Sequence, residues 1–480
     1  MATLSETKPE ATAVADIVHY GEKLVLPSGV TLKQAVDLIM RRMKYEEEVT
    51  RVHSKFDLFP WDGAVLLDNV LKQRYGWSQA VAVESMFGKE LPTLMTVETA
   101  PGVFQPVPWG RFSLPNVEGW IHTHHVHEGA LWKFAITAEI KRRDERVIKD
   151  LFEEVRRRAM TESIYRGKAV KCDFLDKDGA AQTPTPKFMD VSQVDPDMLV
   201  LSDKLERAVE TNLFTPITRV QDILDNGIPV KRGVLLGGTY GTGKTLIAHV
   251  ASRKAVDSGI TFVYIQKAAE LTYAIAFAKQ YQSPACVVFC EDIDREVSGE
   301  RTEDMDAVLN TIDGIDSKTS NIIVVLTTNN IQAIHPAMLR PGRLDAVIDV
   351  TPPDAKAITR LIKVYAKGAL EDNVDLTEVG EVLAGNIPAV IAEVVKRAKL
   401  AQLSLQEPGT WVDKLSAQAL LDSAMTIQAQ VELLKPKEVD KGHTLDSALR
   451  AAVLDSFNGS REKIDHTHKL SKAIAAKVGL

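Results

Sequence analysis

The residues with the clearest chemistry form a glycine-rich run, Gly-Thr-Tyr-Gly-Thr-Gly-Lys-Thr. Its glycines let the backbone turn so that successive N–H groups point at a phosphate, and the following helix presents its positive end. The run follows an apolar strand pattern and opens a helical one, as this motif requires. We therefore predict an ATP-binding loop in which Lys244 contacts the β/γ-phosphates and the Thr245 hydroxyl holds Mg²⁺. The predicted nucleotide-contacting residues are Gly238, Thr239, Tyr240, Gly241, Thr242, Gly243, Lys244, Thr245 and Leu246.

A second candidate group is the acidic pair Glu291-Asp292, which ends the apolar run ACVVFC. In a parallel sheet, the carboxyl end of this strand faces the same crevice as the phosphate loop. One carboxylate there can orient Mg²⁺ and its waters, and the other can polarise the attacking water. We assign Glu291 to the metal together with Thr245, and Asp292 to the water; the sequence alone leaves the exchanged assignment open.

These side chains must be positioned by alternating strands and helices. Apolar strand patterns recur between helical segments, and this alternation predicts an α/β fold with a parallel sheet covered by helices on both faces. The strand patterns are RGVLLGG, ITFVYIQ, ACVVFC, NIIVVLTT and AVIDV. Beyond Pro352-Pro353 the pattern becomes helical, and Asp354 can cap the first of these helices.

The remaining chain divides by composition and periodicity. Trp120–His127 and Leu131–Ile140 alternate like paired strands around a Glu128-Gly129 turn, and Asp144–Thr161 has helical spacing. The expected segments are a disordered tail (1–15), a helical N-terminal region (16–100), an α+β domain (101–180), a linker (181–198), the ATPase domain (199–353), a helical lid (354–435) and a C-terminal extension (436–480).

The motifs also carry a family resemblance. IPVKRGVLLGGTYGTGKTLIA, EDIDR, DAVLNTIDGID, LTTNN and HPAMLRPGRLD resemble the AAA family of the AAA+ P-loop ATPases, which includes proteasomal, membrane-protease and segregase-type members. The whole chain is similar to uncharacterised ATPases of tailed phages and actinobacteria. The resemblance implies that Asn329 is a sensor of the γ-phosphate and that Arg340 and Arg343 are arginine fingers. Fingers that reach a neighbour's nucleotide imply a homo-oligomeric ring, in this family usually a hexamer.

The sequence departs from that family in three places. The acidic pair is Glu-Asp instead of Asp-Glu, which shifts the distances by about one methylene and makes slow hydrolysis an open alternative. Thr239-Tyr240 replaces a Pro-Pro pair in the loop. The stretch after the second strand, Lys267–Tyr281, contains no glycine, so Tyr273 is the one candidate for a substrate-threading aromatic, and packing on a helix is equally compatible with it.

Other chemistry-bearing groups favour ordinary structural roles. His122 and His124 would face one side of a strand while His125 and His127 face the other, which disfavours a shared metal. The basic clusters 141–143 and 156–158 lie beside acidic residues and favour an ion-paired helix surface over nucleic-acid contact. Cys172, Cys286 and Cys290 are too few for a disulfide framework and are expected to be buried thiols.

A net charge of −7 in 480 residues disfavours general nucleic-acid binding. Neither a membrane-spanning run nor a signal-peptide pattern is evident, so a cytoplasmic protein is expected. The favoured function is a ring-forming ATPase that remodels a protein recognised by the N-terminal region. A nucleic-acid loader or initiator and a slow, nucleotide-gated scaffold are the alternatives.

Overall fold

The computed structural model describes residues 18–20, 23–25, 29–76, 80–86, 88–293, 320–333, 344–404, 406–407, 409 and 414–434. The chain forms two compact units. The first comprises Met1–Gly368 and Leu383–Ala392, and the second comprises Ala369–Val382 and Glu393–Leu480.

The first unit contains the predicted α/β sheet. Its strand order is β11-β10-β13-β14-β15-β12-β16. Every neighbouring pair in this order is parallel except β11 and β10. The five predicted strands are β12 (Arg232–Gly237), β13 (Thr261–Ile265), β14 (Cys286–Cys290), β15 (Ile322–Thr328) and β16 (Ala346–Asp349). Every residue of β13, β14 and β15 is buried, as expected for strands covered on both faces. The predicted fold class is therefore confirmed.

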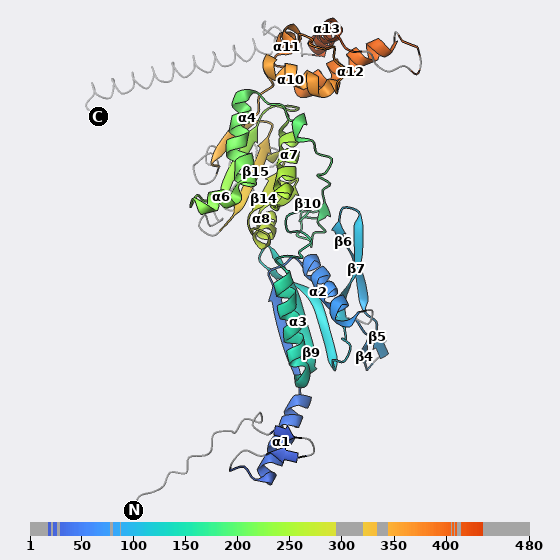
Figure 1. Cartoon of the computed structure of the whole chain (residues 1–480), viewed down its shortest axis with the longest axis vertical. Coiled ribbons are helices and arrows are strands. Elements are labelled where there is room, and N and C mark those ends of the chain that lie inside the picture. Colours follow the sequence, from blue (N-terminus) through green and yellow to red (C-terminus); the bar gives the residue numbers. More distant parts are fainter. Residues whose placement is uncertain are drawn as a thin grey trace, which may run out of the picture. The chain divides into compact units, whose positions relative to one another are not determined.

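Helices cover both faces of this sheet (Figure 1). Alternate strand residues face α7 on one side, such as Phe289, and α8 on the other, such as Val288. The helical elements of this part are η3 (Pro196–Met198), α4 (Asp203–Val209), η4 (Glu210–Phe214), α5 (Thr215–Thr218), α6 (Val220–Asp225), α7 (Lys244–Asp257), η5 (Ala268–Glu270), α8 (Leu271–Gln280), η7 (Ile331–Ala333) and α10 (Ala355–Ala366). The predicted Asp354 cap is confirmed, because its Oδ1 accepts a hydrogen bond from the Ala357 N–H at 2.8 Å.

Two short strands from before the expected ATPase segment extend the sheet at its β13 edge. They are β10 (Ala169–Lys171), parallel to β13, and β11 (Lys187–Phe188), antiparallel to β10. The Cys172 N–H donates to the Tyr264 carbonyl at 3.0 Å and continues the β10–β13 pairing. The parallel sheet thus begins well before residue 199.

The N-terminal part contains a five-stranded antiparallel sheet of order β3-β9-β8-β7-β6. Its strands are β3 (Val49–Phe56), β6 (Thr93–Ala100), β7 (Val103–Phe112), β8 (Gly119–Glu128) and β9 (Leu131–Lys141). The helices α2 (Pro60–Tyr75) and α3 (Glu145–Arg158) pack on one face of it (Figure 1). The β8–β9 hairpin and α3 agree with the sequence patterns.

The helical expectation for residues 16–100 was too broad. Besides α1 (Leu32–Glu47) and α2, this region supplies β3 and β6 to the sheet and contains two short hairpins. The hairpin strands are β1 (Val18–Tyr20), β2 (Lys23–Val25), β4 (Val83–Ser85) and β5 (Gly88–Glu90). β3 is stabilised by pairing with β9, a distant partner that local periodicity does not reveal.

A buried carboxyl group joins the N-terminal sheet domain to the part that contains the parallel sheet. Asp62 on α2 has no exposed surface. It accepts hydrogen bonds from the Ser163 hydroxyl at 2.6 Å, the Ile164 N–H at 2.9 Å and the hydroxyl of Tyr281, just after α8, at 3.0 Å. Burial raises the pKa of Asp62 to about 6, although these hydrogen bonds act in the opposite direction.

We expect the free energy of unfolding of the wild-type protein to fall between about pH 4 and pH 6 because of Asp62, and we expect Asp62→Asn to abolish this fall. Because the folded-state pKa is raised, Asp62 favours folding while it is protonated, and that contribution is lost as pH rises through about 6. This pH-dependent contribution of Asp62 to the free energy of unfolding is about 3 kcal/mol. Unfolding free energies of wild type and variant, measured across this range, should diverge as pH rises. Asp57→Asn, at an exposed carboxylate nearby, is the control. Parallel wild-type and Asp62→Asn curves would contradict the assignment.

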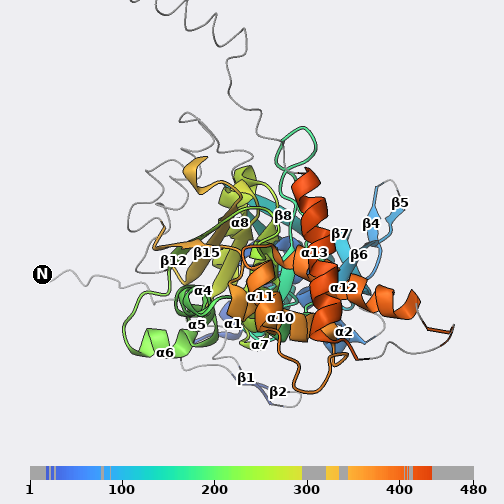
Figure 2. The ribbon, with the colours of Figure 1, turned by 90° about the horizontal axis from the view of Figure 1, so that it is seen from above.

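The second unit is helical. It contains most of α11 (Thr377–Leu383) and of α12 (Pro388–Ser404), together with α13 (Ala417–Leu434), and these helices lie together in both views (Figures 1 and 2). The Gln428 amide donates to the Val382 carbonyl at 2.5 Å, which ties α13 to α11. Among the helices that the structure describes, none has the length and apolar composition to cross a bilayer.

Candidate nucleotide site

The glycine-rich run connects β12 to α7 at the carboxyl end of the parallel sheet. Gly238 has φ +150°, and a Cβ there would lie 2.3 Å from the Val350 carbonyl oxygen. Gly243 precedes α7 with φ +105°, a left-handed conformation that glycine adopts without strain. The loop therefore passes close to the sheet and leads directly into a helix N-terminus, which is the local geometry of a phosphate loop.

Two side chains at the start of α7 have different surroundings. Lys244 is 7% exposed, and its Nζ donates to the carbonyl oxygens of Gly238 at 2.6 Å and Thr239 at 3.0 Å. The Thr245 hydroxyl donates to Glu291 Oε1 at 2.8 Å. The ammonium group thus lies inside the loop, and the hydroxyl is joined to the end of β14.

The acidic pair divides between two environments. Glu291 follows Phe289 at the strand period of two and faces α7, where it meets Thr245. Asp292 instead accepts a hydrogen bond at Oδ1 from the Asn329 amide at 2.8 Å. Its own N–H donates to the Thr327 hydroxyl at 2.9 Å, and its φ is +47°. A positive φ at a residue other than glycine is uncommon and is typical of functional sites.

This cluster contains one further residue, Tyr264, that was not among the predicted site residues. The hydroxyl of Tyr264 on β13 donates a short hydrogen bond to Glu291 Oε2. Burial, followed by the contact with Glu291, raises the pKa of Tyr264 well above its usual range, so it stays a neutral donor. The sequence signal that could have found it is the phenolic hydroxyl of Tyr264 within the otherwise apolar run ITFVYIQ.

The donor set fits Mg·ATP. A threonine hydroxyl and a carboxylate 2.8 Å apart supply the oxygen ligands that Mg²⁺ prefers, beside a loop whose ammonium group suits phosphate oxygens. Thr245 and Glu291 would hold the metal side, and Lys244 with the loop N–H groups would hold the phosphates. The predicted fingers Arg340 and Arg343 lie outside the described residues.

The candidate threading aromatic packs inside the fold. Tyr273 lies on α8, is partly buried, and stacks on the Phe174 ring with centroids 6.2 Å apart. β13 ends at Ile265 and η5 begins at Ala268, so no long loop separates strand and helix here. The packing interpretation of Tyr273 is the one that the geometry favours.

The histidine run divides as the strand period predicts. The rings of His122 and His124 lie 5.0 Å apart on one face of β8, whereas His125 and His127 contact Trp132. No group of three or more metal-ligating side chains occurs within the described part of the chain. All three cysteines are buried thiols, as expected.

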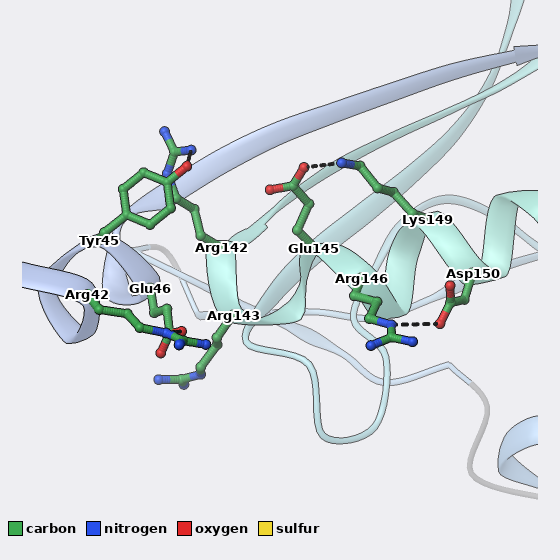
Figure 3. A pocket seen from close by; sticks show the side chains of 9 residues that line it. All are labelled: Arg42, Tyr45, Glu46, Arg142, Arg143, Glu145, Arg146, Lys149 and Asp150. Atoms are coloured by element: carbon green, nitrogen blue, oxygen red, sulfur yellow. Dashed lines mark hydrogen bonds and ion pairs between the residues drawn. The ribbon is translucent and has the colours of Figure 1, made fainter. Parts of the chain in front are cut away.

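A cavity of about 720 Å³ lies between α1, η2 (Arg142–Asp144) and the start of α3 (Figure 3). Its cations are engaged by neighbours. Arg42 pairs with Glu46 at 2.7 Å and Lys149 with Glu145 at 2.6 Å. Further contacts in the cavity are Arg146–Asp150 and Arg142–Tyr45. Outside the cavity, on α3, Arg156 pairs with Glu153 and Arg157 pairs with Glu154. The basic clusters therefore belong to ion-paired surfaces, as the sequence favoured.

Comparison with known proteins agrees with the geometry. Residues 234–352 match the ATPase family associated with various cellular activities (AAA). The chain is 28% identical over 289 residues to the ATP-dependent zinc metalloprotease FtsH of Synechococcus sp. (strain JA-2-3B'a(2-13)), covering 55% of this chain and 43% of that protein. It is 33% identical over 208 residues to FtsH 2 of Sphaerobacter thermophilus, covering 40% and 32%. FtsH 4 of Synechocystis sp. is 30% identical over 247 residues, covering 48% and 39%.

The chain spans less than half the length of each of these relatives. The match to the family includes the phosphate loop, the acidic pair and Asn329. Together with the parallel sheet and the contacts at the carboxyl ends of its strands, this match identifies the chain as carrying a P-loop ATPase domain of the AAA family, which uses ATP with Mg²⁺.

Proposed function

We propose that this chain hydrolyses ATP in a ring of identical subunits, in this family usually a hexamer, and uses the hydrolysis to remodel a protein or protein assembly. The proposed ATP hydrolysis rests on one observation: the two residues of the acidic pair make different contacts. Glu291 is held toward Thr245 and Asp292 toward Asn329, so the two carboxylates serve separate positions beside one phosphate loop.

Each residue then has a distinct role. Lys244 and the loop N–H groups bind the β/γ-phosphates, while Thr245 and Glu291 hold Mg²⁺, which neutralises charge on the phosphate oxygens when bound. Asp292 accepts a proton from the attacking water, and Asn329 orients Asp292 and senses the γ-phosphate. Arg340 and Arg343 complete the site of a neighbouring subunit.

A protein target is favoured over nucleic acid. The basic clusters on α3 are paired with Glu153 and Glu154, and the chain carries a net charge of −7. The relatives named above are proteases that depend on ATP. The sequence contains no His-Glu-x-x-His motif, so zinc proteolysis is not part of the proposal. The N-terminal domain is the proposed site of target recognition.

The biological part of the proposal is tested by ATPase rates measured alone, with an unfolded polypeptide and with single-stranded DNA. Stimulation by the polypeptide supports protein remodelling. Stimulation by DNA alone would favour a loader. A slow rate that neither addition changes would favour a nucleotide-gated scaffold.

For the chemical part, we expect Asp292→Asn to keep Mg·ATP binding and to lower turnover by at least about a hundredfold. Asparagine tolerates the positive φ of this position and has nearly the same shape, so the change removes the base without disturbing the fold. Single-turnover hydrolysis and nucleotide binding would be measured together. If Asp292→Asn lost binding while Glu291→Gln retained it, the two roles would have to be exchanged.

A further inference from the structure

We propose that Tyr264 is a positioning residue of the magnesium site, whose hydroxyl holds Glu291 in the orientation that meets Thr245. This inference rests on the proposed Mg²⁺-dependent ATPase function and adds a residue from a strand that carries neither the phosphate loop nor the acidic pair.

The geometry follows from strand register. Tyr264 pairs directly with Phe289 across β13 and β14, so Glu291 occupies the diagonal position two residues further on, on the same face. The ring of Tyr264 stacks on Phe289 with centroids 5.7 Å apart and planes inclined by 14°. Stacking fixes the ring, and the hydroxyl then reaches Glu291 Oε2.

The two oxygens of Glu291 have different donors. Oε2 accepts from Tyr264, while Oε1 accepts from the Thr245 hydroxyl at 2.8 Å. A glutamate has one more rotatable bond than the aspartate usual at this position in the family, so its carboxylate has more orientations available. The tyrosine restricts those orientations and directs the second oxygen toward the metal side.

The tyrosine is itself supported from the N-terminal side of the chain. Lys171 on β10 pairs with Tyr264 in the sheet and places its ammonium group 5.8 Å from the ring centroid. The same ammonium group donates to Gln266 Oε1 at 2.9 Å. The added strand β10 therefore contacts the residue that orients Glu291.

The test is Tyr264→Phe, which removes one oxygen and keeps the stacked ring. Binding of a fluorescent, non-hydrolysable ATP analogue is titrated with Mg²⁺. We expect the Mg²⁺ concentration for half-maximal enhancement to rise about tenfold, because a hydrogen bond to a charged group is lost, while affinity in excess EDTA stays unchanged. Tyr273→Phe makes the same chemical change at a packed tyrosine on α8 and should leave both values unaltered.

A double-mutant cycle separates positioning from general destabilisation. Glu291→Asp shortens the carboxylate so that it no longer reaches Tyr264, and adding Tyr264→Phe to it should then have no further effect on the Mg²⁺ requirement. Equal effects of Tyr264→Phe in both backgrounds, or an unchanged Mg²⁺ requirement in the single variant, would overturn the proposal. If the nucleotide affinity of the wild-type protein did not depend on the Mg²⁺ concentration, the proposed ATPase function itself would be contradicted.

Discussion

Lys244→Ala is expected to abolish ATP binding. The side chain is 7% exposed and its ammonium group lies among the carbonyls of the phosphate loop, where it would counter the charge of the β/γ-phosphates. Hydrogen bonds to charged groups contribute about 1.5–3 kcal/mol each, so losing the contacts to two phosphates should weaken affinity by at least about a hundredfold. Equilibrium binding of a fluorescent ATP analogue measures this directly.

The matched control is Lys254→Ala in the last turn of the same helix, where the ammonium group lies 5.0 Å from the ring of Phe214. It should leave nucleotide affinity unchanged. Circular dichroism and thermal unfolding would check that both variants fold. Affinity of a folded Lys244→Ala protein within about threefold of wild type would show that this loop is not the ATP site.

The ATPase sheet was predictable because its signals are local. Each apolar run is short, and most lie between helical patterns. β13, β14 and β15 are buried on both faces, so pattern and burial agree for these strands. The meeting of Thr245 and Glu291 was predictable for a related reason, since the carboxyl ends of neighbouring parallel strands share one edge of a sheet.

What the sequence did not predict depends on distant pairing. β3 has few buried side chains and forms a strand because β9 pairs with it, while β11, with two residues, is too short to be recognised by period. The role of Tyr264 requires the exact partner of each residue on β13 and β14, because a shift by one residue would turn its hydroxyl away from Glu291. Register is set by the whole sheet, and one strand's sequence does not contain it.

Activity is expected to depend on contact between subunits through Arg340 and Arg343. Both precede Asp345, which joins the sheet beside Gly233, with the Asp345 N–H 2.7 Å from the Gly233 carbonyl. Gly233 is near the amino end of β12, whereas the phosphate loop follows Gly237 at its carboxyl end. The four residue steps from Gly233 to Gly237 span about 13 Å. Under the proposed function, the two arginines act on a neighbour's ATP.

If the arginines act in trans, ATPase rate per subunit should rise with protein concentration and reach a plateau as rings form. An arginine supplied by a neighbour contributes about 10³–10⁵ in rate, so each subunit carrying Arg340→Ala and Arg343→Ala inactivates the site next to it. Mixed into wild-type protein, this variant should lower activity more steeply than its mole fraction if hydrolysis is coordinated around the ring. It should still bind ATP normally, because Lys244 and Thr245 are unchanged.

Arg219→Ala, which removes an exposed arginine paired with Asp222, serves as the control and should not poison wild-type activity. Light scattering at each concentration relates the ATPase rate to the assembled mass. Two results together would exclude an ATP site shared between subunits. The ATPase rate per subunit would not change on dilution, and activity would fall only in proportion to the added double variant. The two arginines would then belong to a structural turn, and the ATPase domain would act within a single subunit as a nucleotide switch.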